Sequence, residues 1–231
     1  QILHRSTPPP HLANQPNPRT RWLMLALVWL AYASFGLTVG TIPPLVEPII
    51  QDLKITYSQM GLVLGAWQLL FIVTATPLGA LVDRLGVRRA FGIGIGIIWI
   101  SLVLRGIAVD FTTLFASVAL FGFGGPIISI GAPKVVALWF HGKERSLAAG
   151  IYTTAPISGL AIALATAPGW IMQLTNTWRG TSLVYGGVIM VVFFAWWLFA
   201  KDIQTSQGLP LESTRYEPLP RAIAGLLHLR N

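Results

Sequence analysis

Residues 79–89 read GALVDRLGVRR and connect two long apolar stretches of the chain. This connector holds two glycines and a dense cluster of charge, although only 10% of all residues are charged. The residues concerned are Gly79, Asp83, Arg84, Gly86, Arg88 and Arg89. A short basic turn between two apolar segments is typical of the cytoplasmic face of a membrane protein. The stretch therefore predicts that two membrane-spanning helices meet here.

The composition of the whole chain favours the same class of protein. The 231 residues are 54% hydrophobic, with a mean hydropathy of +0.65, which is more apolar than a soluble domain of this size can bury. The net charge of +8 would suit a nucleic-acid partner, but the basic residues are confined to connectors and tails. We therefore expect membrane lipid, and not nucleic acid, as the surrounding partner. The absence of cysteine excludes disulfides and thiol chemistry.

Six stretches are long enough to cross about 30 Å of hydrocarbon, which takes roughly 20 apolar residues. They run from about Trp22 to Ile42, Met60 to Val82, Ala90 to Val109, Thr112 to Phe140, Ser146 to Met172, and Ser182 to Ala200. The sequence predicts an all-α integral membrane fold with a six-helix bundle over 21–200. The proline-rich residues 1–20 are expected to form a disordered cytoplasmic tail. Residues 201–231 are expected to form a cytoplasmic linker that stops short of a further helix.

The distribution of lysine and arginine predicts the orientation, because these residues accumulate on the cytoplasmic side. With the N-terminus inside, the cytoplasmic set is Arg5, Arg19, Arg21, Arg84, Arg88, Arg89, Lys143, Arg145, Lys201, Arg215, Arg221 and Arg230. The opposite side receives only Lys54, Arg179 and the borderline Arg105. We therefore expect a multi-pass protein of the inner (plasma) membrane with both termini in the cytoplasm.

Small residues and prolines distinguish the first, second, fourth and fifth spans. Glycine pairs that permit close helix packing are Gly36 with Gly40, Gly61 with Gly65, and Gly122 with Gly124 and Gly125. Prolines in or near these spans are Pro77, Pro126, Pro133, Pro156 and Pro168, which favour bendable helices. Pro77, Arg88 and Gly96 also recur in the same order and spacing as Pro168, Arg179 and Gly187, which suggests a 3+3 inverted repeat.

The connector 79–89 resembles the signature loop of major facilitator superfamily transporters, Gly-x-Leu-x-Asp-Arg-x-Gly-x-Arg-Arg. A second stretch, LWFHGKERSLAAGI, is similar to another motif of these porters through Trp139, Phe140, Glu144, Arg145, Ala148 and Gly150. Trp178 and Arg179 add to the likeness, and cyanate-type permeases and related small-anion carriers are the most similar branches. The resemblance implies the N-terminal six-helix half of a facilitator fold. The missing partner is then a C-terminal half or a second copy of the chain.

Two positions depart from features of this family. Val118 stands where proton-coupled members carry an arginine, and Ala75 stands where nitrate porters carry one. Both departures argue against proton antiport and nitrate transport. The resemblance still implies secondary active or facilitated transport of a small, anionic solute by alternating access, without a bound cofactor.

The resemblance also implies roles for residues of the two motifs. Asp83, with Arg84, would form a latch that closes the cytoplasmic side, together with the loop residues Gly79, Gly86, Arg88, Arg89, Glu144 and Arg145. The alternative is that this charge cluster only anchors the loop at the lipid headgroups.

Several polar residues within the spans are candidates for the solute pathway. Lys134 lies about 9 Å from the end of its span at 1.5 Å per residue, so it either faces a cavity or extends its ammonium to the interface. Gln68, Tyr152 and Tyr32 are neutral candidates, which could equally satisfy a neighbouring helix. Arg105, near the outer end of its span, is expected to extend toward the membrane surface.

The residues favour no enzymatic or metal chemistry. His4, His11, His141 and His228 lie in tails or a loop, without metal-ligand spacing. The GIGIG run at 92–96 lacks the preceding strand of a nucleotide fingerprint, so it is interpreted as a packing face. The competing hypothesis to transport is a non-transporting structural or assembly subunit of a larger membrane complex.

Overall fold

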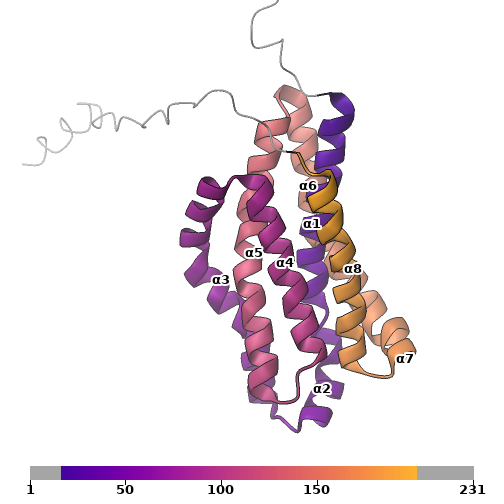
Figure 1. The fold of residues 1–231 in the computed structure, drawn as a ribbon. Helices are drawn as coiled ribbons and strands as arrows, with labels where there is room; N and C mark the ends of the chain where they lie inside the picture. The colour runs from indigo at the N-terminus through magenta and orange to yellow at the C-terminus, as the bar shows by residue number, and fades with distance from the viewer. Residues whose placement is uncertain (1–16, 202–231) are drawn as a thin grey trace, which may run out of the picture.

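The computed structural model describes residues 17–201, which form an all-helical bundle (Figure 1). Within this range six segments are long and apolar enough to cross a membrane. They are Pro18–Leu53, Tyr57–Leu85, Val87–Gly106, Phe111–Trp139, Gly142–Thr175 and Trp178–Phe199. The predicted six-helix membrane fold is confirmed. Most of the predicted terminal tails, 1–16 and 202–231, lie outside the described residues.

The first span consists of a long helix, a break and a short helix. Helix α1 (Pro18–Gly40) begins earlier than expected, because the side chain of Asn17 caps it and Pro18 suits a first helical turn. Residues 18–20 therefore belong to the bundle and not to the tail. The prolines at 43 and 44 lack the N–H groups that would continue α1. A 3₁₀ turn, η1 (Pro43–Leu45), and helix α2 (Val46–Leu53) follow, and the sequence patterns did not predict α2.

Helices α3 (Tyr57–Leu85) and α4 (Val87–Gly106) are joined by the single residue Gly86. Its φ of 77° lies in a region that glycine adopts without steric cost. The side chains of Thr56 and Gln59 form a capping box at the start of α3. The signature connector is thus a one-residue turn between two helices.

The second half of the bundle begins with α5 (Phe111–Trp139) and α6 (Gly142–Thr166). The expected helix from Ser146 to Met172 is not continuous. It passes into a π-helical turn, η2 (Ala167–Ile171), and a short helix, α7 (Met172–Thr175). Pro168 explains the change, because it cannot donate the hydrogen bond of a regular α-helix. Helix α8 (Trp178–Phe199) completes the fold.

The bundle has two distinct ends (Figure 1). Helix α1 begins and α8 ends at one of them, where the α3–α4 and α5–α6 connections also lie; we name it the termini end. Helices α2 and α7 lie at the opposite end, named here the α2 end. Helix α4 packs between α5 and α8, while α3 packs mainly on α5 and α6 mainly on α1. Helices α3 and α6 therefore each have one well-packed side.

This packing has the internal symmetry that the repeated residues predicted. The second span packs on the fourth and the fifth packs on the first. This is expected when two three-helix units are related by a pseudo-two-fold axis. Two arginines at the starts of α4 and α8 make contacts that match under this symmetry. Arg88, at the start of α4, donates to the carbonyl of Trp197 near the end of α8 at 3.3 Å. Arg179, at the start of α8, donates to the carbonyl of Ala108 just after α4 at 2.7 Å.

Glycine contacts confirm some of the predicted close approaches and correct one. A Cβ atom added at Gly36 would lie 1.9 Å from the carbonyl oxygen of Pro156, so α1 and α6 touch through their backbones. One added at Gly122 would lie 2.7 Å from a backbone oxygen of α3. Gly61 and Gly65 have no such neighbour within 4 Å, so their predicted packing role is wrong. The reason is that they lie on a side of α3 that no helix of the described range covers.

Candidate functional site

The signature aspartate is paired at the termini end of the bundle. The Nζ atom of Lys134 on α5 lies 2.5 Å from Oδ1 of Asp83 on α3. The Asp83 side chain is 67% exposed and that of Lys134 is 35% exposed. An ion pair this accessible contributes only about 0–1 kcal/mol, because water and salt screen it.

This pair gives Lys134 a partner that the sequence patterns did not predict. The ammonium neither extends alone to the interface nor stands unpaired inside the bundle, because it binds a carboxylate on the neighbouring helix. Lys134 also lines a cavity of about 590 Å³ at the termini end, together with Asp83, Gly86, Arg88 and Arg89. Asp83, the predicted latch residue, is thus paired with Lys134, whereas the sequence grouped it with Arg84.

The remaining motif residues lie around the same end. Gly79 packs near Ile130 on α5, and Arg84 and Arg89 are exposed. The indole N–H of Trp196 donates to the carbonyl of Arg88 at 2.8 Å, which ties the turn to α8. The second motif reaches α1, since Arg21 pairs with Glu144 at 2.9 Å, while Arg145 is exposed. The two predicted motifs therefore organise separate contacts at the same end.

Two of the three neutral pathway candidates, Tyr32 and Tyr152, lie side by side. The rings of Tyr32 on α1 and Tyr152 on α6 stack with centroids 6.3 Å apart and an interplanar angle of 26°. Both lie about 15–21 Å from the start of their helices at 1.5 Å per residue, which is mid-membrane depth. Within residues 17–201, no hydrogen bond holds either tyrosine hydroxyl. In the described range, the two hydroxyls therefore keep their capacity to donate a hydrogen bond.

Gln68 stands apart from the tyrosine pair. It is exposed on α3, and its amide has no hydrogen-bond partner in the described part of the chain. An aromatic cluster adjoins the tyrosines, in which Phe35 contacts Tyr32 at 5.9 Å and Trp67, the chain neighbour of Gln68, at 5.7 Å between centroids. Aromatic contacts thus join α1 to α3 at this level.

The prediction for Arg105 is wrong. Its side chain is 2% exposed and turns into the bundle, where Nη1 donates to the carbonyl of Thr38 at 3.1 Å. The guanidinium also lies 5.6 Å from the ring centroid of Phe121. The physical reason is the break after α1. Carbonyls at the end of a helix carry partial negative charge, which attracts a cation.

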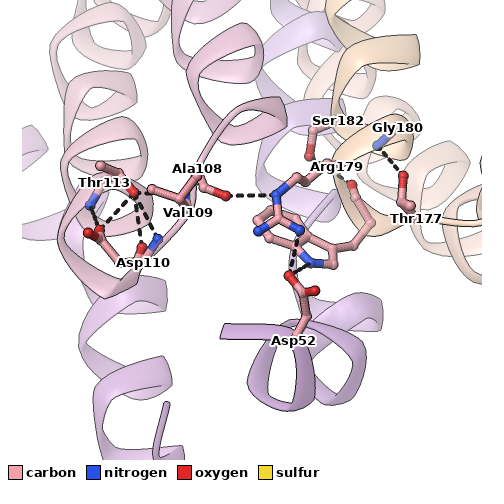
Figure 2. A network of polar contacts seen from close by, with 10 residues as sticks. Asp52, Ala108, Val109, Asp110, Thr113, Thr177, Arg179, Gly180 and Ser182 are labelled. Carbon is pink, nitrogen blue, oxygen red and sulfur yellow. Dashed lines mark hydrogen bonds and ion pairs between the residues drawn. The ribbon is translucent and has the colours of Figure 1, made fainter. Parts of the chain in front are cut away.

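The sequence patterns missed a polar network at the α2 end (Figure 2). Asp52 on α2 accepts hydrogen bonds from the indole N–H of Trp178 at 3.1 Å and from Nη1 of Arg179 at 2.5 Å. Arg179 also binds the carbonyl of Ala108, so three segments converge on one guanidinium. A signal was present, because Asp52 is one of only 8 acidic residues in the chain.

Asp110 caps α5 close to this network (Figure 2). Its Oδ1 atom accepts hydrogen bonds from the backbone N–H of Thr113 and from the Thr113 hydroxyl, both at 2.8 Å. These bonds favour the ionised carboxylate and hold the pKa of Asp110 below its usual value. In the described range, no group of three or more His, Cys, Asp or Glu side chains could hold a metal ion.

Comparison with known proteins agrees with the observed helix arrangement. A family model described as the Major Facilitator Superfamily matches residues 28–231. The chain is 25% identical over 192 residues to a D-galactonate transporter of Escherichia coli O6:H1, covering 83% of this chain and 44% of that protein. It is 30% identical over 177 residues to a probable nitrate transporter, NarT, of Staphylococcus carnosus, covering 74% and 44%.

A solved structure shows the same fold. It is a bacterial homologue of the human lysosomal transporter Spinster in an inward-facing, unoccupied conformation, with a TM-score of 0.72 and 20% identity. The match covers 86% of this chain and 48% of that one. The chain spans about half the length of the curated relatives it matches. With its six apolar helices and the matched family model, the chain is a multi-pass membrane protein that belongs to the Major Facilitator Superfamily.

Proposed function

We propose that the chain forms one wall of a pathway that carries a small anionic solute across the inner membrane by alternating access. The solute class is supported by relatives whose names include D-galactonate, hexuronate, galactarate/D-glucarate and nitrate. The single observation that carries the mechanism is the exposed Asp83–Lys134 pair, which joins α3 to α5 at the termini end. We place that end, with both termini, in the cytoplasm. Transport by this mechanism uses no bound cofactor.

The proposed pathway runs from the midspan tyrosines to this ion pair. Tyr32 and Tyr152 offer hydroxyl donors to an anion at mid-depth, and Gln68 offers an amide from α3. Lys134 contributes positive charge at the end of the pathway, where its pairing with Asp83 makes it part of the latch. Arg84, Arg88, Arg89 and Arg145 hold the latch region at the anionic headgroups.

The energy of the pair is suited to this role. A contribution of up to about 1 kcal/mol shifts a two-state equilibrium by no more than about fivefold. The pair can therefore bias the transporter toward one state without trapping it there. A second, solute-dependent contribution must complete the switch, because a ligand shifts an equilibrium only through its different affinity for the two states.

Solute uptake into vesicles tests the proposal. The purified protein, with any subunit that remains bound to it, is reconstituted and supplied with radiolabelled galactonate, glucarate or nitrate. We expect saturable uptake of at least one of these anions. Folded, correctly inserted protein that takes up none of them would instead support the non-transporting subunit hypothesis.

The latch requires a sharper experiment. Asp83→Asn is expected to slow uptake by about two- to fivefold, as loss of a screened ion pair predicts. Exchanging the two charges, Asp83→Lys with Lys134→Asp, is expected to restore part of the rate. Asp110→Asn is the matched control, because it removes an acidic charge at the other end of α5 and asparagine still caps a helix. An Asp83→Asn rate equal to wild type would reduce the pair to a loop anchor.

A further inference from the structure

The cavity at the termini end carries more positive charge than the latch uses. Its lining contains four basic residues and one acidic residue: Arg88, Arg89, Lys134, Lys201 and Asp83. Asp83 is already engaged by Lys134. Among residues 17–201, Arg89 and Lys201 form no ion pair with an acidic side chain. The cavity therefore keeps an excess of positive charge that the described bundle does not neutralise.

The rest of the lining is apolar. The apolar residues that line it include Met24 on α1, Val82 on α3, Leu138 and Trp139 on α5, and Trp196 on α8. Leu138 is 42% exposed, so the apolar lining reaches the outside of the bundle, while Trp139 and Trp196 are buried. A space of about 590 Å³ lined by both basic and apolar residues matches an amphiphile better than a freely soluble ion.

The depth of the cavity is that of the membrane interface. Lys134 lies about 8 Å from the end of α5 at 1.5 Å per residue, and the other basic groups lie at helix ends. Lys201 lies two residues after the end of α8, and its backbone N–H donates to the sulfur of Met24 at 3.3 Å, which fixes the residue beside the cavity. Phosphates of membrane lipids lie at this level, and basic pockets between membrane helices bind them.

We propose that this cavity binds the headgroup of an anionic phospholipid. The phosphate diester is bound by Arg89 and Lys201, and its acyl chains leave along the apolar side of Leu138. The guanidinium of Arg89 can hold two phosphate oxygens at once, and Lys201 supplies a point charge from α8. The lipid thus bridges the α3–α4 turn to the end of α8. The proposal is independent of whether the chain transports a solute.

Lipid binding to the full chain in detergent tests this proposal. The probes are dioctanoyl phosphatidylglycerol, dioctanoyl phosphatidylcholine and inorganic phosphate, and the readouts are native mass spectrometry and thermal stability. We expect the chain to bind phosphatidylglycerol about tenfold or more tightly than phosphatidylcholine, because the basic groups favour net negative charge. The preference is expected to weaken in high salt, since the charges are partly exposed.

Variants distinguish lipid binding in the cavity from lipid binding to general surface charge. Arg89→Gln with Lys201→Gln is expected to reduce the preference to within about twofold, since two of the basic groups that create it are gone. Lys54→Gln with Lys143→Gln is the matched control, because it removes equal charge outside the cavity and should keep the preference. Equal binding of the two lipids by wild type would overturn the proposal, as would an undiminished preference in the first variant. Inorganic phosphate that stabilises the chain as strongly as phosphatidylglycerol would identify a free-anion site instead and overturn the lipid assignment.

Discussion

At the scale of single residues, Arg105 shows how far a side chain's role depends on its neighbours. A fully buried guanidinium is costly, because it loses its hydration, and few groups replace that water here. Its Nη1 atom binds the carbonyl of Thr38, whereas Nε has no hydrogen-bond partner in the described structure. The side chain therefore fills space and satisfies a helix end at the same time. These two contributions can be separated by substitution.

Arg105→Ala should lower the stability of the folded bundle by about 2–5 kcal/mol, because it leaves a large void beside Phe121. Arg105→Met should cost no more than about 1.5 kcal/mol, since it keeps most of the volume and removes a desolvated charge. Thermal unfolding in detergent measures both changes. If the methionine variant were as unstable as the alanine variant, the charge and not the volume would be the larger contribution.

The glycines of the α1–α6 contact permit a second test. A Cβ atom added at Gly159 would lie 1.9 Å from the carbonyl oxygen of Ala33, so the two backbones would have to separate. Gly159→Ala should therefore destabilise the protein by about 2–3 kcal/mol. Gly61→Ala is the control, because its added methyl group meets nothing within 4 Å. It should stabilise α3 by about 0.5–1 kcal/mol, and the same thermal unfolding compares the two variants.

At the scale of elements, the starts of α4 and α8 are held in reciprocal fashion. Arg88 binds a carbonyl near the end of α8, and Arg179 binds one just after α4. Asp52 of α2 adds a carboxylate to the Arg179 contact (Figure 2). This carboxylate adds a polar contact to α2, which is also held by the hydrogen bond from the Tyr57 hydroxyl to Glu47 and by the burial of Ile49. Helix α2 should therefore respond to its loss more than any transmembrane helix.

Asp52→Asn should increase hydrogen exchange of the amides of Val46–Leu53 by about fivefold, as loss of an accessible ion pair of about 1 kcal/mol predicts. Exchange in α5 should stay as it is in wild type. Lys54→Gln, next to α2 but outside the network, provides the control. Unchanged exchange in the Asp52→Asn variant would mean that packing and the Tyr57–Glu47 hydrogen bond hold α2 in place without it.

The cap of α5 predicts a pH dependence. Because the pKa of Asp110 is lowered in the folded chain, its stabilising effect is complete above its unfolded value of about 4. The effect is lost as the pH falls through the lower folded-state pKa. The first turn of α5 should therefore exchange its amides faster, relative to the rest of α5, when the pH drops from 5 to about 3. In Asp110→Asn the relative rate should not vary over this range, because asparagine does not titrate.

At the scale of the whole molecule, two transmembrane helices present broad apolar surfaces outward. Ile72 and Val73 on α3, and Ile157 on α6, are about 70% exposed in the described bundle. In water such surfaces would cause aggregation, whereas in a bilayer they meet lipid or another membrane helix. The one-sided packing of α3 and α6 is therefore consistent with a fold whose solvent is the membrane.

The orientation of the bundle can be measured without background, because the chain contains no cysteine. Ser146 on α6 and Ser58 on α3 are exposed near the termini end and the α2 end, respectively. In intact cells, a membrane-impermeant maleimide should label Ser58→Cys and leave Ser146→Cys unlabelled until the membrane is opened. The reverse pattern would invert the proposed topology and place the latch outside the cell.

Much of this fold follows from local properties of the chain. The number of spans was predictable because an apolar segment must be long enough to cross the hydrocarbon core of the bilayer. The position of the sharp turn was predictable because Gly86 tolerates a backbone that other residues avoid. The π-helical turn and α2 were not predicted, because hydropathy does not report how a helix ends or bends.

The sequence alone thus determined the membrane environment, the six helices and the basic connector, since each depends on residues close together in the chain. Only the tertiary structure decided the partners of the charged residues. Lys134 meets Asp83 across 51 residues, Arg105 meets Thr38 across 67, and Arg179 meets Asp52 across 127. The physical reason is that a charge buried in or near lipid must find a partner in space. Which partner lies within reach is set by how the helices pack, and not by their order in the sequence.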